Sequence, residues 1–417
     1  MPVVTNHPRI GTCPTAGGES TGENQLTTRI ARGLDGALLL GGDAGALGIA
    51  RSLGRAGIPV IFLPGVNPIA KYSRYVSRTI SWPGAEAPGA AEWLLALANT
   101  EGLAGWVLFP SADSDVRLVA KHHDALAHAY RLTTPPWENL KWAADKHLTS
   151  IRAAELGIPH PRTYTISNAA DARDVDCQFP LILKPAAKQG VNALTRSKVW
   201  LAHDRAELVR MFEYGSSLAG DAGLVVQEFI PGGDAKQFSY AAACLDGQPL
   251  VSMTARRSRQ VPAGFGTGTF VETLGPMPYE AEAERFLRSI SYTGLVEMEF
   301  KLDQRDGRYK LLDVNPRVWT WNALGVEAGV DFALAMWKIA RGEAVMRARA
   351  KPGAAWLYLT RDLSESLKQM RRGALRLPDY AASLMRRKCY AIFADDDPLP
   401  AVIDLPIALA RRWREGR

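Results

Sequence analysis

The sequence predicts an α/β and α+β protein, in which a parallel βαβ unit precedes a strand-rich region and a basic helical C-terminal segment. Residues 36–63 contain an apolar run, a glycine-rich turn, a helical pattern and a second apolar run, which is the order of a βαβ unit. Short apolar runs fill most of residues 180–314, which indicates an α+β region. Residues 346–417 combine helical spacing with an excess of Lys and Arg.

The overall composition is that of a globular chain. Its 417 residues predict about three domains, and 47% hydrophobic with 22% charged residues excludes a wholly disordered or collagen-like protein. No apolar run approaches the roughly 18 residues of a membrane helix, and we expect no secretory signal in the first thirty residues. The four cysteines form no Cys-x-x-Cys pair, which favours a cytoplasmic location and argues against structural zinc.

Composition and turn signals divide the chain into four expected parts. Residues 1–33 are rich in Thr, Gly, Asn and Pro without a period, and we expect them to be disordered. Residues 34–135 hold the βαβ unit and end at two consecutive prolines. Residues 136–345 are expected to form one domain of two subdomains divided near 203–222, and residues 346–417 to form a helical extension.

The net positive charge of the chain comes from residues 346–417. The net charge is +7, and residues 346–417 hold 15 Lys and Arg against 8 Asp and Glu, so the rest of the chain is neutral. A whole-domain basic surface is therefore missing, and we expect no nucleic-acid partner. The helices of this segment either pack on the preceding domain or make weak contact with a membrane surface through Trp413 and its neighbouring arginines.

Several catalytic motifs are missing from the sequence. There is no His-Glu-x-x-His, no Gly-x-Ser-x-Gly and no Walker phosphate loop. The turn Gly41-Gly-Asp-Ala-Gly-Ala-Leu-Gly48 does not fit the dinucleotide pattern Gly-x-Gly-x-x-Gly. We interpret it as a structural turn or as one end of a substrate pocket. Asp113 follows the next strand, over residues 106–110, at the edge where α/β sheets place ligands.

The most informative segment is a predicted hairpin at residues 295–314. Its two strands are joined by a turn that carries the Asp-Gly signal. Residues two apart on a strand share a face, so Glu299 can meet Asp313 and Asn315 across the ladder. Two carboxylates and an amide oxygen are hard ligands that suit Mg²⁺ bridging nucleotide phosphates. Arg317 lies two residues further along, where a guanidinium can hold a phosphoryl group or a carboxylate.

A second charged segment runs from Ala255 to Glu272. It places three arginines before a glycine-rich stretch. It is either a charged strand edge followed by a loop or a site for an anionic substrate. For the second interpretation the best candidate is Arg259, because it lies nearest the glycines.

These motifs resemble the ATP-grasp superfamily, and more closely its carboxylate-amine ligases and carbamoyl-phosphate-synthase-like members. The resemblance covers about residues 36–345, and the metal-binding hairpin is its most specific part. It implies an ATP-grasp fold preceded by a pre-ATP-grasp domain that faces the acceptor substrate. It also implies that Glu299, Asp313 and Asn315 bind magnesium, with Mn²⁺ as an alternative, and that Arg317 steadies an acyl phosphate.

The resemblance assigns the phosphate-binding lysines. Ile182-Leu-Lys-Pro185 matches the strand whose lysine, here Lys184, grips the α- and β-phosphates of ATP. Asp145-Lys-His147 matches the helix start that carries a second phosphate lysine, here Lys146. The loop that follows Lys184 departs from the family, because it holds a single glycine where Gly and Ser are usual, and Lys188 would add a charge there instead.

The resemblance also assigns the adenine hinge. Val225-Val-Gln-Glu-Phe-Ile-Pro-Gly232 matches it. Either Gln227 or Glu228 would face the adenine amino group, and Asp234 would hold the ribose hydroxyls. Backbone groups of this segment would pair with the base; the hinge residues are Gln227, Glu228, Phe229 and Ile230.

The sequence therefore predicts an ATP-dependent carboxylate-amine ligase that forms ADP. Its partners are expected to be a small-molecule carboxylate and an amine, and a homodimer is in keeping with the resemblance. Two alternatives stay open at this point. The same fold could run a phosphotransferase reaction without an amine acceptor, or it could bind a nucleotide as a non-catalytic partner protein.

Overall fold

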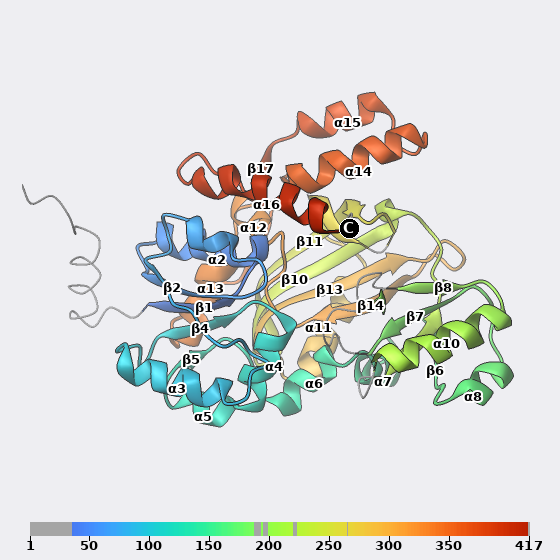
Figure 1. The fold of residues 1–417 in the computed structure, drawn as a ribbon, viewed down its shortest axis with the longest axis horizontal. Coiled ribbons are helices and arrows are strands. Elements are labelled where there is room, and N and C mark those ends of the chain that lie inside the picture. The colour runs from blue at the N-terminus through green and yellow to red at the C-terminus, as the bar shows by residue number, and fades with distance from the viewer. Residues whose placement is uncertain (1–35, 187–192, 195–198, 220–222, 265, 416–417) are drawn as a thin grey trace, which may run out of the picture. The chain divides into compact units, whose positions relative to one another are not determined.

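The structure is a computed structural model that describes residues 36–186, 193–194, 199–219, 223–264 and 266–415 (Figure 1). The described residues belong to one compact unit, Asp35–Arg417. The N-terminal segment 1–33 and the candidate Lys188 lie outside the described residues.

The first sheet is parallel and has the order β3-β2-β1-β4-β5. Its central strands are buried, which explains why they are continuous apolar runs in the sequence. The predicted βαβ unit is confirmed as β1-α2-β2. The strands are β1 (Ala37–Gly41), β2 (Val60–Pro64), β3 (Arg78–Thr79), β4 (Val107–Pro110) and β5 (Arg131–Leu132), with α2 (Asp43–Arg55), η1 (Ile69–Tyr72), α3 (Ala90–Thr100), α4 (Asp113–Lys121) and α5 (His123–Ala127).

A small antiparallel sheet of order β6-β9-β7-β8 follows. Strand β9 pairs with β7, so the chain leaves this sheet after Glu228, later than the subdomain division that we expected near residues 203–222. The elements here are α6 (Trp137–Ala144), α7 (Lys146–Glu155), β6 (Thr163–Tyr164), α8 (Ala169–Asp174), β7 (Leu181–Pro185), β8 (Trp200–Ala202), α10 (Arg205–Ala219) and β9 (Leu224–Glu228).

The large sheet has eight strands in the order β14-β13-β10-β11-β12-β16-β17, with β15 paired to β11. Successive residues of β10 face opposite cores: Ala241 and Ala243 pack with α13, whereas Tyr240 and Ala242 pack with α11. The sheet is therefore covered on both faces. Its elements are η3 (Asp234–Lys236), β10 (Gln237–Leu245), β11 (Gln248–Val261), β12 (Thr267–Leu274), α11 (Glu280–Ser289), β13 (Gly294–Leu302), β14 (Tyr309–Asn315), α12 (Leu324–Glu327), α13 (Phe332–Ala340), β15 (Ala348–Arg349), β16 (Ala355–Leu357) and β17 (Lys388–Tyr390).

Strand β11 corrects one expectation. The arginine-rich segment is the second half of a strand of 14 residues, and β12 begins at Thr267, within the glycine-rich stretch that one of our two interpretations made a loop. The pattern misled us because Arg257 and Arg259 are both buried, at 5% and 7% exposure, where apolar residues are usual.

The C-terminal segment contains the expected helices, α14 (Leu359–Arg371), α15 (Leu377–Leu384) and α16 (Leu399–Glu415). It is more than a helical appendage, because β16 and β17 extend the large sheet. Asp397 accepts hydrogen bonds from Arg51 Nε (2.9 Å) and Ser73 Oγ (2.7 Å), which fixes the segment to α2 and η1 of the first sheet. No helix among the described residues is long and apolar enough to cross a membrane.

Candidate functional site

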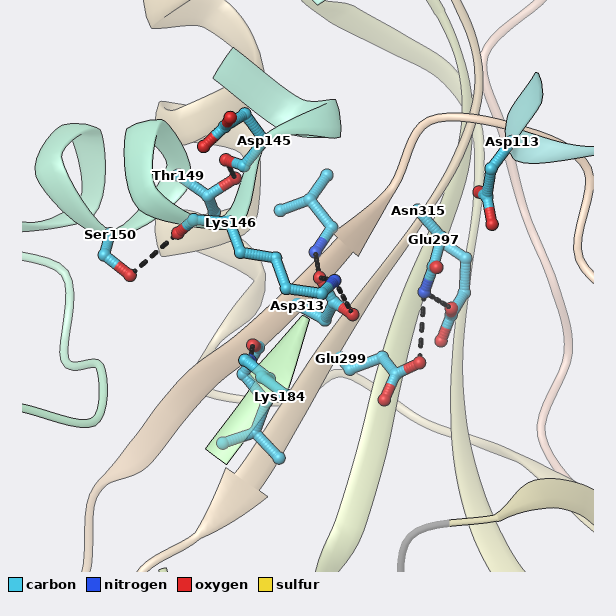
Figure 2. Close-up of polar contacts among 12 residues, drawn as sticks. Asp113, Asp145, Lys146, Thr149, Ser150, Lys184, Glu297, Glu299, Asp313 and Asn315 are labelled. Carbon is cyan, nitrogen blue, oxygen red and sulfur yellow. Dashed lines mark hydrogen bonds and ion pairs between the residues drawn. The ribbon is translucent and has the colours of Figure 1, made fainter. Parts of the chain in front are cut away.

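The hairpin of β13 and β14 forms the centre of the site, as the sequence predicts. Its register places Glu299 opposite Asp313 and Glu297 opposite Asn315. The Asn315 amide donates to Glu297 Oε2 at 2.9 Å and to Glu299 Oε1 at 3.0 Å (Figure 2). The two glutamates and the asparagine therefore form one cluster on one face of the hairpin.

A β-bulge shapes the part of the hairpin that meets the lysines. The pairing shifts between Glu299 and Phe300, so Leu312 is an extra residue on β14. The carbonyl of Leu312 accepts a hydrogen bond from Lys184 Nζ at 3.3 Å. Lys146, at the first position of α7, contacts both oxygens of Asp313 at 2.7 Å (Figure 2).

The two lysines lie on different elements and converge on β14. Lys184 belongs to β7 of the small sheet, and burial lowers its pKa to about 8 against the opposing effect of Asp313. Burial also opposes the charge of Lys146, but Asp313 outweighs it and raises the pKa of this lysine. Lys146 is therefore paired with a carboxylate, whereas Lys184 contacts a backbone carbonyl of the same strand.

Arg257 completes the cluster and was not predicted. Its guanidinium lies 2.7 Å from Glu297 Oε1 and 2.7 Å from Glu299 Oε1, and its side chain is 6% exposed. Burial works to raise the pKa of Glu299, but Arg257 overcomes this effect, so the pKa is lowered. Gln237 also donates to Glu299 Oε2 at 2.9 Å. Arg257 therefore keeps Glu299 ionised.

The donor set fits a divalent cation that shares its remaining ligands with a nucleotide. Glu299 and Asp313 supply hard anionic oxygens and Asn315 supplies a neutral one. Among the described residues, no three His, Cys, Asp or Glu side chains gather into a metal site by themselves. A cation here would therefore depend on Asn315 and on phosphate oxygens.

Arg317 links the hairpin to the first sheet. Its Nε donates to Asp113 Oδ1 at 2.5 Å, and its Nη2 donates to Asn315 Oδ1 at 3.3 Å. Burial would lower the pKa of Arg317, but Asp113 raises it. Asp113 is the first residue of α4, directly beyond β4. Arg317 thus lies between the metal-type cluster and the edge of the sheet where α/β proteins bind ligands.

The expected adenine hinge follows β9. Gln227 is buried, and its amide donates to Thr163 Oγ1 at 2.8 Å. Glu228 is held by Arg305 at 2.5 Å and faces Lys310 at 3.8 Å. The Glu228 carboxylate therefore already has cationic partners. The side-chain oxygen of Gln227, Oε1, has no hydrogen-bond partner among the described residues.

The other hinge residues lie beside the edge of the large sheet. The ammonium group of Lys301 lies 5.4 Å from the ring centroid of Phe229, and Ile230 is buried. Asp234 accepts a hydrogen bond from Gly264 N at 2.6 Å, and burial raises its pKa. Asp234 therefore has a backbone partner from the turn that follows β11.

Arg259 does not join the cluster. It forms a two-bond ion pair with Asp362 of α14, at 2.9 Å for both bonds, and lies against the rings of Phe270 and Tyr380. The register of β11 with β12 shifts between Arg257 and Arg259. The bulge gives a physical reason why two arginines two positions apart have different surroundings. The structure gives Arg259 an ion pair with Asp362, and its contact with a substrate, one of two interpretations of the segment, stays a prediction.

The glycine turn of the first sheet is closely packed. Gly41 has φ +105°, and a Cβ there would lie 2.1 Å from Ser111 Oγ and 2.7 Å from Asp115 Oδ2. Only glycine fits this position. Asp115 accepts a hydrogen bond from Ala112 N at 3.1 Å, and burial raises its pKa to about 6.

The raised pKa of Asp115 predicts that the stability of the protein depends on pH. The pKa of this carboxyl is about 3.9 in an unfolded chain and rises to about 6 in the folded protein. The folded protein therefore holds the proton more tightly, and the contribution of Asp115 to the free energy of unfolding is complete below the unfolded pKa. This contribution is lost as the pH rises through the folded value. The free energy of unfolding of the wild type, minus that of Asp115→Asn, is expected to fall by about 2 kcal/mol between pH 4 and pH 7. Urea unfolding of both proteins measures this difference. A difference that does not change with pH would contradict the prediction.

Comparisons with known proteins find relatives by sequence. The family model of the carbamoyl-phosphate synthase L chain, ATP binding domain, matches residues 277–347, which include the hairpin. D-aspartate ligase from Enterococcus faecium is 25% identical over 308 residues, which cover 67% of this chain and 70% of that protein. The carbamoyl phosphate synthase large chain of Caldanaerobacter subterraneus subsp. tengcongensis is 25% identical over 216 residues, 49% of this chain but only 19% of that one.

A solved structure gives the fold independently. The biotin carboxylase domain of the 2-oxoglutarate carboxylase from Hydrogenobacter thermophilus, in complex with MgADP, ADP and bicarbonate, superimposes with a TM-score of 0.60. The two chains are 16% identical, and the match covers 76% of this chain and 73% of that one.

The chain shares its fold with ATP-grasp proteins of known structure, and the hairpin lies in the segment that the family model matches. Within that class its relatives are carboxylate-amine ligases and carbamoyl-phosphate-synthase-type enzymes. The predicted resemblance and the predicted α/β fold are thereby confirmed, and the expectation of an ATP-dependent ligase agrees with the ligases among these relatives.

Proposed function

We propose that this chain activates a substrate carboxylate as an acyl phosphate with ATP and Mg²⁺, and then joins it to an amine, releasing ADP and phosphate. The observation that carries the proposal is the convergence of Lys146 and Lys184, from two different elements, on the strand that also holds Asp313 and Asn315. Positioning and charge neutralisation are the main requirements of phosphoryl transfer.

In the first step a carboxylate oxygen attacks the γ-phosphorus, and the bond to the bridging oxygen breaks so that ADP leaves. Lys146 and Lys184 offset the charge of the phosphates, and Arg317 steadies the new acyl phosphate. Mg²⁺, when bound by Glu299 and its partners on the hairpin, supplies further charge neutralisation. In the second step the neutral amine nitrogen forms the C–N bond, phosphate leaves with the electron pair of the C–O bond, and the proton released from the nitrogen passes to the departing phosphate.

The nucleotide roles of the hinge are part of the proposal. Gln227, whose carbonyl oxygen is buried, is the better candidate to face the adenine amino group, because Glu228 is held by Arg305. Asp234 would accept hydrogen bonds from the ribose hydroxyls in place of the one that it accepts from Gly264 N. We also propose a cytoplasmic enzyme that forms a homodimer, accepts Mn²⁺ in place of Mg²⁺, and makes at most weak contact with membrane surfaces.

The test is ADP release by the purified protein with ATP and Mg²⁺, screened against pooled amino acids and sugar acids, with mass spectrometry of the products. A rise in ADP that depends on a pool and yields the mass of an amide supports the ligase. ADP release with a phosphorylated acid but no amide would instead establish a phosphotransferase. Tight ATP binding without turnover in any pool would favour a non-catalytic partner protein.

A further inference from the structure

The C-terminal segment reaches the glycine turn of the first sheet through one side chain. Arg361, in the first turn of α14, places its Nη2 atom 3.3 Å from Asp43 Oδ1. Asp43 is the first residue of α2 and has φ +63°, a conformation that non-glycine residues rarely adopt. Asn67 donates to the same oxygen at 3.0 Å. Strained residues of this kind gather at functional sites.

The helix that begins at Asp43 contacts the chain just beyond Arg317. A Cβ on Gly45, two residues beyond Asp43, would lie 3.2 Å from the carbonyl oxygen of Trp319, so the start of α2 contacts the chain that follows Arg317. Asp113, the partner of Arg317, begins α4 beyond β4, and β4 is the neighbour of β1 in the sheet. Two arginines and two aspartates thus line one edge of the first sheet.

Both ion pairs are partly open to solvent. The side chains of Arg361 and Asp43 are 29% and 33% exposed, and those of Arg317 and Asp113 are 19% and 37% exposed. Ion pairs open to solvent contribute little stability. A ligand with one positive and one negative group can separate such a pair, because its negative group then binds the arginine and its positive group binds the aspartate. No charge is left unpaired.

A buried ion pair on the same helix differs from these two partly exposed pairs. Asp362, the neighbour of Arg361, is fully buried and forms two bonds of 2.9 Å with Arg259. Thr269 also donates to Asp362 at 2.8 Å. Asp362 therefore fixes α14 on β11 and β12, and this anchor holds Arg361 at the glycine turn.

We propose that Arg361 binds a carboxylate of the amine acceptor, so that the acceptor is an amino acid or a peptide with a free carboxylate rather than a simple amine. Asp43 orients the guanidinium in the free protein and faces the ammonium group of the acceptor in the complex. The C-terminal segment thus provides a specificity residue of the acceptor site. The inference rests on the proposed ligase function.

The experiment compares the acceptor found in the screen with its decarboxylated analogue, in the wild type and in Arg361→Met. Methionine keeps an unbranched apolar stem but removes the charge. The variant is expected to raise the KM for the carboxylate-bearing acceptor by about 10- to 100-fold, with an unchanged kcat and an unchanged KM for ATP. Its KM for the decarboxylated amine should match that of the wild type. Arg361→Lys should recover part of the loss.

Arg371→Met is the matched control, because Arg371 is exposed at the far end of the same helix. It should behave as the wild type does. If Arg361→Met leaves the acceptor KM unchanged, or if the wild type prefers the decarboxylated amine, the inference is overturned while the ligase stands. If the wild type forms no amide with any acceptor, the proposed function itself fails, and the inference fails with it.

Discussion

Replacing Asp313 by asparagine is expected to lower ADP release roughly 1000-fold, which in practice abolishes ATP turnover. The change removes one of the two carboxylates that the cation site needs, and it replaces one of the two oxygens that Lys146 contacts at 2.7 Å by an amide nitrogen and removes the negative charge. The fold should persist, because the pair of Lys146 and Asp313 is partly exposed and such pairs contribute on the order of 1 kcal/mol.

The measurement is the rate of ADP release at saturating ATP and Mg²⁺, with thermal unfolding to verify the fold. Asp306→Asn is the control, because Asp306 is an exposed carboxylate in the turn of the same hairpin. It should keep the wild-type rate. Undiminished ADP release by Asp313→Asn would refute the assignment of Asp313 to the metal.

Replacing Arg257 by methionine should have the largest effect on stability. Glu297 and Glu299 would stay buried next to each other without the guanidinium that lies 2.7 Å from both. Removing one partner from a buried ion pair costs about 3–5 kcal/mol. The pKa of Glu299, which Arg257 lowers, should rise in the variant.

Urea unfolding measures the loss of stability, and Arg285→Met on the exposed face of α11 is the control, with an expected change within about 0.5 kcal/mol. Adding Glu297→Gln to Arg257→Met should restore part of the stability, because one buried negative charge is removed. An Arg257→Met protein as stable as the wild type would show that the guanidinium does not compensate the two glutamates.

The hairpin could be predicted from the sequence because its signals are local. The alternation of β13 and β14 and the Asp-Gly turn between them determine which residues share a face, and the register places Glu299 opposite Asp313 as expected. The helix that begins after Asp145 was equally clear, since Asp145 accepts from the backbone of His147 as an N-cap.

The part of the site that the sequence did not predict depends on distant pairing. Arg257 and Arg259 look equivalent in the sequence, and only the bulge of β11 against β12 and the packing of α14 give them different partners. The sequence pattern does not show which of two arginines forms an ion pair with a glutamate on another strand. In hindsight, three arginines within an otherwise strand-like segment indicated that at least one of them was buried with an acidic partner.

The contact between Arg51 and Asp397 has a consequence for how this protein is synthesised. The two residues are 346 positions apart, and both side chains are almost fully buried. At common translation rates, Arg51 leaves the ribosome roughly 20 to 70 s before its partner is made. During that interval the guanidinium lacks its partner, so this side of α2 cannot reach its final packing until Asp397 has been made. The strands of the first sheet are all made by Leu132, but one side of the helix that covers it is closed only about 265 residues later.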